Sequence, residues 1–159
     1  TQNILLNLLE GTSGILGKEK EGGYKIMIYV AYGSNLNKGQ MSLRCPNAVA
    51  LGKMYLPDYK LVFRGVADIE ESKGDYVPVG LWEVTEDCIK SLDRYEGTPI
   101  LYSQVEIGVG FTYQMNNSGY ALPSINYLRS IYQGYLDFDF NDDDINQLLA
   151  GANYQQQAG

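Results

Sequence analysis

Two separated segments of the chain carry the residues that could do chemistry. The first is the turn Tyr32-Gly33-Ser34-Asn35, which directly follows an apolar run at residues 26–31. A glycine in such a turn lets backbone N–H groups converge on one point, where they can hold a carboxylate or an oxyanion. Most turns of this composition are only structural. The second segment contains Glu96, which supplies the general base that such a pocket would need.

The position of Glu96 predicts a carboxyl group with a raised pKa. Its helix is expected to follow Thr85 as N-cap and to end before Gly97, with Ile89, Leu92 and Glu96 on one inward face. Partial burial and the negative end of the helix dipole both disfavour the ionised carboxylate. A raised pKa is the tuning expected of a general base near neutral pH. The alternative is a solvated glutamate in the last turn of a helix.

The composition of the chain further limits the reactions and partners that can be expected. The 159 residues include no histidine, which excludes Ser-His-Asp and Cys-His nucleophiles and His-containing zinc sites. The net charge is −7 without a basic cluster, so neither nucleic acid nor an anionic membrane surface is expected as a partner. Residues 137–144 begin like a calcium loop, but Asp142 and Leu148 replace the glycine and glutamate that such a loop requires. No metal is therefore expected there.

The two cysteines and the ends of the chain bear on location and domain organisation. Cys45 and Cys88 form no CxxC pair, and we interpret them as free thiols of a cytoplasmic protein, the alternative being a disulfide in an oxidising compartment.

Neither a signal peptide nor a membrane span is recognisable. Residues 1–26 are expected to be an N-terminal extension, flexible or artificially added, residues 27–150 the domain, and residues 151–159 a C-terminal tail.

The elements that must position these residues indicate an α+β domain. Strands are predicted at residues 26–31, 48–56, 59–64, 65–69, 76–84, 101–107 and 111–115, and helices at 36–44, 85–96, 125–135 and 144–149. Residues 70–75 are expected to be a loop, and Met41 and Leu43 to face inward. The connection at 108–110 makes an unusually tight hairpin. Many short strands with a few helices favour a curled sheet or a small barrel.

The turn at residues 32–35 and the downstream motif Leu92-Asp93-Arg94-Tyr95-Glu96-Gly97 form a specific pair. Further segments that fit the same pattern are residues 29–31, 36, 43–46, 80–84, 102–107, 113–115, 123–127 and 131–134. Together these segments resemble the gamma-glutamylcyclotransferases, and the resemblance covers residues 28–150.

The resemblance implies an α+β fold, a small mixed β-barrel with flanking helices, and an enzyme without a metal or other cofactor. It implies that Glu96 is the catalytic acid/base. The substrate-binding residues that it implies are Tyr29, Val30, Ala31, Tyr32, Gly33, Ser34, Asn35, Tyr113 and Tyr127. The short connection at residues 108–110 departs from the longer hairpin of the family and bears on the placement of Tyr113.

The implied reaction is the cyclisation of a gamma-glutamyl compound. Its α-amine attacks its own γ-carbonyl, 5-oxoproline forms, and a free amine or amino acid departs, which assigns the chain to cytoplasmic glutathione metabolism. One alternative is another gamma-glutamyl leaving group, such as ε-lysine or a protected natural product, selected by loops such as residues 70–75. Another alternative is a non-catalytic module that binds an amino-acid-like ligand. A homodimer is left open.

Overall fold

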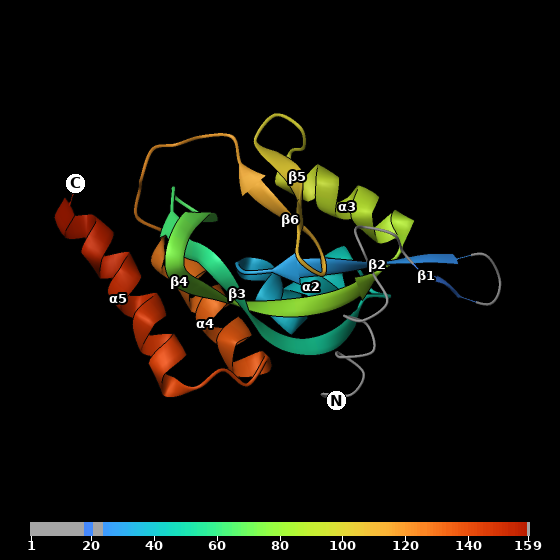
Figure 1. Cartoon of the computed structure of the whole chain (residues 1–159), viewed down its shortest axis with the longest axis horizontal. Helices are drawn as coiled ribbons and strands as arrows, with labels where there is room; N and C mark the ends of the chain where they lie inside the picture. The colour runs from blue at the N-terminus through green and yellow to red at the C-terminus, as the bar shows by residue number, and fades with distance from the viewer. Residues whose placement is uncertain (1–17, 21–23, 159) are drawn as a thin grey trace.

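A mixed β-sheet with helices packed around it forms the body of the chain (Figure 1). The computed structural model describes residues 18–20 and 24–158, with side-chain surroundings from residue 27 to residue 152. The strands are β1 (Lys18–Lys20), β2 (Tyr24–Ala31), β3 (Val49–Phe63), β4 (Ala67–Val84), β5 (Tyr102–Ile107) and β6 (Gly110–Met115). The helices are the 3-10 turn η1 (Ser34–Leu36), α2 (Lys38–Arg44), α3 (Glu86–Glu96), α4 (Ile125–Asp137) and α5 (Asp142–Ala158).

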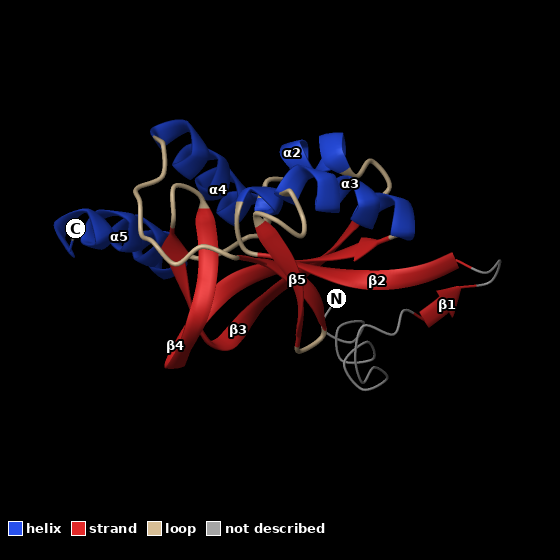
Figure 2. Ribbon diagram, turned by 90° about the horizontal axis from the view of Figure 1, so that it is seen from above, coloured by secondary structure: helices blue, strands red, loops and turns tan. Residues whose placement is uncertain are grey.

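The sheet places β2 near its centre. Its strand order is β3-β4-β2-β6-β5, and β1 pairs with β2. β2 runs antiparallel to β4 and meets β6 in a parallel pairing at Tyr29 and Phe111. Helices α2, α3 and α4 lie over one side of the sheet, and α5 lies at the β3–β4 end (Figure 2). The α+β class is confirmed, although the curled sheet stays open in the described residues, so "barrel" describes it only loosely.

β3 and β4 form one long hairpin, where separate shorter strands were expected. The pairing passes from Pro57 and Tyr76 to Tyr59 and Glu71 across an irregularity, and Asp58 has a φ of 63° there. The expectation of a loop at residues 70–75 is wrong, because these residues belong to β4. A bulge can take up extra residues without ending the ladder, so turn-forming residues do not always terminate a strand.

The predicted hairpin between β5 and β6 is confirmed and is as tight as the sequence implies. Ile107 pairs with Gly110, and Gly108 adopts a φ of 51°. Glycine reaches this left-handed region at little cost because it lacks a Cβ atom.

The caps of α3 and the buried face of α2 were predicted with unequal success. The Thr85 side chain accepts a hydrogen bond from the backbone N–H of Cys88, and Gly97 adopts a φ of 64°, as expected. Met41 is fully buried, but the prediction for Leu43 is wrong because its side chain is 84% exposed. Residues two apart on an α-helix lie about 200° apart around its axis, so they cannot share one face.

The two cysteines are joined. A disulfide links Cys45, the C-cap of α2, to Cys88 in α3 across a sequence separation of 43. The prediction of two free thiols is therefore wrong, because the packing of α2 against α3 brings these side chains together. None of the helices in the described part of the chain is long and apolar enough to cross a membrane.

Candidate active site

A cavity of about 320 Å³ brings the two predicted chemical segments together. Gly33, Ser34 and Asn35 line it from the turn after β2, and Glu96 lines it from the last residue of α3. The turn is held in place by α4, since a Cβ atom added at Gly134 would lie 2.5 Å from the Cβ atom of Leu36. The close approach of these backbones therefore positions η1, and with it the cavity wall.

Most of the implied substrate-binding residues lie around this cavity. The lining residues among them are Tyr29, Tyr32, Gly33, Ser34, Asn35, Tyr113 and Tyr127. Val30 and Ala31 instead pack in the core with no exposed surface, and they are not among the lining residues. A contact between substrate and these two residues stays a prediction.

Position 33 leaves little space for a side chain. Gly33 has a φ of −117°, outside the left-handed region. A Cβ atom added there would lie 3.2 Å from the hydroxyl oxygen of Tyr127 and 3.3 Å from the Cβ atom of Ala67. The Tyr127 hydroxyl accepts a hydrogen bond from the Ala67 backbone N–H at 3.0 Å and is also hydrogen-bonded to the Ser34 backbone. Gly33 thus permits the turn, β4 and α4 to meet.

The tyrosine hydroxyl groups are held by specific partners. Tyr32 donates to the backbone oxygen of Tyr113 at 2.5 Å, and Tyr113 donates to Asp93 Oδ1 at 2.6 Å. Tyr102 donates to the Ala67 backbone oxygen at 3.2 Å. The short connection at residues 108–110 therefore does not remove Tyr113 from the cavity.

Burial raises the pKa of each of these cavity tyrosines, so their hydroxyl groups remain protonated near neutral pH. The residues concerned are Tyr29, Tyr32, Tyr102, Tyr113 and Tyr127. Neutral phenols at these positions serve as hydrogen-bonding groups rather than as bases.

Glu96 is the titratable group that burial tunes toward neutral pH. Its side chain is partly buried, and this desolvation raises its pKa to about 7, while the positive charge of Arg44 acts in the opposite direction. The predicted direction of the shift is confirmed. A carboxyl group with such a pKa in a cavity is a candidate acid/base.

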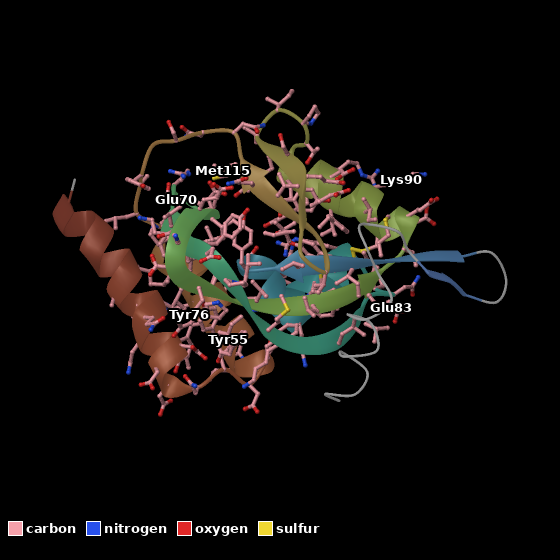
Figure 3. All side chains as sticks on the ribbon, viewed as in Figure 1. Tyr55, Glu70, Tyr76, Glu83, Lys90 and Met115 are labelled. Carbon is pink, nitrogen blue, oxygen red and sulfur yellow. A yellow bond between two sulfur atoms is a disulfide. The ribbon has the colours of Figure 1, made fainter. Side chains whose placement is uncertain are left out.

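The cavity is also lined by residues to which the sequence gave no role. These are Val66, Leu101, Met115 and Tyr95, which is 49% exposed. The only sequence signals were that Tyr95 and Met115 lie within segments that match the family pattern. Figure 3 shows Met115 at the end of β6.

Residues 70–75, which we expected to select the leaving group, are not among the residues that line this cavity. Figure 3 shows Tyr76, the residue that follows them, beside α5. Asp75 and Tyr76 line a separate cavity of about 290 Å³ next to that helix. The expectation that residues 70–75 line the pocket is therefore wrong.

An α+β fold thus carries a cavity in which one carboxyl group with a raised pKa lies among tyrosines that burial keeps neutral. The sequence matches the family model "Gamma-glutamyl cyclotransferase, AIG2-like" over residues 29–135. The chain belongs to this family and is an enzyme of the gamma-glutamylcyclotransferase class.

Relatives and a solved structure agree with this assignment. A gamma-glutamylcyclotransferase of Bos taurus is 33% identical over 129 residues, covering 67% of this chain and 69% of the relative. That of Mus musculus is 34% identical over 143 residues, covering 76% and 74%. A solved gamma-glutamyl cyclotransferase structure matches with a TM-score of 0.73 at 28% identity, covering 79% of this chain and 88% of that one.

Proposed function

We propose that the chain releases 5-oxoproline from a gamma-glutamyl amine or peptide, with Glu96 as the catalytic acid/base. The observation that carries this proposal is that a carboxyl group with a pKa of about 7 lies in the same cavity as the Gly33–Ser34 turn. One group can then exchange protons while another part of the wall holds the substrate.

The substrate contains its own nucleophile. Glu96 takes a proton from the α-ammonium group, and the freed nitrogen lone pair attacks the γ-carbon to form an oxyanion. The bond from that carbon to the leaving nitrogen then breaks, and the carbonyl re-forms. The α-nitrogen loses two protons and the leaving nitrogen gains two, so Glu96 ends unchanged. Holding the amine near the carbonyl supplies much of the rate enhancement, because the attack closes a five-membered ring.

Neutral donors are available to hold the negative charges of the substrate. None of the described residues that line the cavity is a lysine or an arginine. We expect the backbone N–H groups at Gly33 and Ser34 to bind the oxyanion or the α-carboxylate, with the Ser34 group exchanging its contact with the Tyr127 hydroxyl for the substrate. The Tyr29 and Tyr127 hydroxyl groups accept hydrogen bonds and can serve as further donors.

A panel of gamma-glutamyl amines and amino acids, including gamma-glutamyl-ε-lysine, tests the activity and its leaving group. We expect release of 5-oxoproline from at least one member, and chromatography of the products would measure it. Calorimetric binding without turnover of any member would instead support the non-catalytic module. Val66, Leu101 and Met115 are apolar residues that line the cavity, and we expect an apolar part of the leaving group to contact them.

The biological setting stays a prediction. The disulfide between Cys45 and Cys88 removes the free-thiol argument for the cytoplasm, because disulfides are rare there. Participation in glutathione metabolism, a homodimeric state and the exclusion of nucleic acid as a partner remain expectations from the sequence.

A further inference from the structure

Arg44 connects the two walls of the cavity without lining it. Its guanidinium carbon lies 3.6 Å from the ring centroid of Tyr95. Its Nη1 atom donates to Asn35 Oδ1 at 2.5 Å, and its Nη2 atom donates to Gln40 Oε1 at 3.1 Å. Tyr95 and Asn35 both line the cavity, so one cation contacts the helix end that carries Glu96 and also the turn opposite.

The contact with Asn35 fixes the orientation of that amide. Because Oδ1 accepts from Arg44, the Nδ2 group of Asn35 is directed to the hydroxyl oxygen of Tyr29, 3.0 Å away. Tyr29 therefore accepts a hydrogen bond and keeps its own O–H as a donor within the cavity that it lines. The backbone oxygen of Asn35 also accepts from Trp82 Nε1 at 3.0 Å, which anchors the residue from the sheet side.

The backbone at Arg44 is tied to the helix of Glu96. Cys45 is the next residue, and its disulfide partner Cys88 lies in α3. The guanidinium is also stacked on Tyr95, the residue before Glu96. A planar cation held on a ring and by two amide oxygens has little freedom to turn away.

Arg44 contributes the positive charge among the groups that act on Glu96. Its charge lowers the pKa of Glu96 against the effect of burial. Among the described residues, four tyrosines also interact electrostatically with Glu96, and Tyr113 of β6 lines the same cavity. The four are Tyr29, Tyr32, Tyr102 and Tyr127, from β2, the turn, β5 and α4. Because burial keeps these phenols neutral, they do not replace the charge of Arg44.

We propose that Arg44 is a positioning residue of the cyclisation site, which holds Asn35 and Tyr95 in place and sets a fixed positive charge beside Glu96. This inference rests on the proposed catalytic role of Glu96. Without Arg44, the carboxyl group would hold its proton more strongly, and less of the base form would be present at neutral pH.

The test is a titration of the Glu96 carboxyl carbon by ¹³C NMR in the full chain, with Glu96→Gln to assign the signal. In Arg44→Met, which keeps an unbranched side chain but removes the charge, we expect the midpoint to rise by about 0.5–1 pH unit. The acid limb of kcat/KM should move upward by the same amount. A structural role alone would change stability and leave both midpoints in place.

Arg94→Met is the matched control, because Arg94 is an exposed cation on the same helix, two residues before Glu96. It should leave the Glu96 midpoint unchanged. A folded Arg44→Met variant with the wild-type midpoint would overturn the proposal. If that variant does not fold, Arg44→Gln allows the same titration with an uncharged hydrogen-bonding side chain.

The carboxyl titration does not depend on catalytic turnover. Failure of the proposal for Arg44 can therefore be distinguished from failure of the proposal for Glu96. An unshifted midpoint refutes the role of Arg44, whereas retained activity in Glu96→Gln refutes the catalytic role of Glu96.

Discussion

Gly33 leaves room for the hydroxyl group of Tyr127, because a Cβ atom added at Gly33 would lie only 3.2 Å from that oxygen. The same hydroxyl accepts the backbone N–H of Ala67 at 3.0 Å. The turn after β2, the start of β4 and the first part of α4 therefore meet at one point of the cavity wall. A side chain at position 33 would disturb the wall that is proposed to hold the substrate.

Replacement of Gly33 tests this relationship. In Gly33→Val we expect kcat/KM to fall by more than tenfold, while the free energy of unfolding falls by about 1–3 kcal/mol, as for overpacking. Steady-state kinetics and urea denaturation would measure the two effects. Gly119→Ala is the control, because its added Cβ would make only an ordinary contact of 3.8 Å. Simple unfolding of Gly33→Val would show that the turn is structural.

Replacement of the proposed acid/base is the direct test of the mechanism. In Glu96→Gln we expect an intact fold and a loss of turnover of about 10²–10⁴-fold, because the amide cannot exchange the proton. The 5-oxoproline assay measures the loss, and Glu106→Gln on the exposed side of β5 is the control. Near-normal release of 5-oxoproline by Glu96→Gln would contradict the assignment.

The enzyme should lose activity in acid, because Glu96 becomes protonated and can no longer act as a base. The pKa of Glu96 is raised to about 7, so kcat/KM should fall about tenfold per pH unit well below that value. A pH–rate profile of the wild type checks this. In Glu96→Gln, the pH profile of the residual activity should not show this fall at low pH. An identical fall in that variant would assign the titration to another group.

The same pKa shift predicts a pH-dependent effect on stability. The folded-state pKa of about 7 lies above the ordinary value of 4.5, so the fold favours the protonated carboxyl group. Folding therefore becomes less favourable as pH rises from 4.5 to 7, and the loss is complete above that range. Glu96→Gln should be more stable than the wild type by about 1–3 kcal/mol at pH 8. The two proteins should have the same unfolding free energy at pH 4. Urea denaturation at pH 4 and pH 8 provides the comparison.

Loss of the disulfide should weaken the fold. Replacement of Cys45 and Cys88 by serine removes a cross-link over a sequence separation of 43 and should cost about 2–4 kcal/mol of unfolding free energy. Thiol labelling of the unfolded, unreduced wild type should detect no free cysteine. Labelling of both cysteines under those conditions would show that the cross-link does not form.

Much of the site could be predicted because its signals are local. The caps of α3 depend on Thr85 and Gly97 themselves, and the position of Glu96 on the inward face follows from its spacing to Leu92. The turn at Gly33 was likewise predicted from its own residues. The sequence pointed to converging backbone N–H groups, and the structure adds that the contact with Tyr127 leaves little space for a side chain.

By itself, the amino-acid sequence determined that the chain has no histidine, where Glu96 ends its helix, and that the turn and the glutamate belong to one family pattern. Only the tertiary structure decided that Cys45 meets Cys88 and that Arg44 lies between Asn35 and Tyr95. The physical reason is the separation along the sequence of the residues that determine each feature. Caps, turns and helical faces depend on neighbouring residues, whereas these contacts depend on how the curled sheet and its helices bring distant segments together.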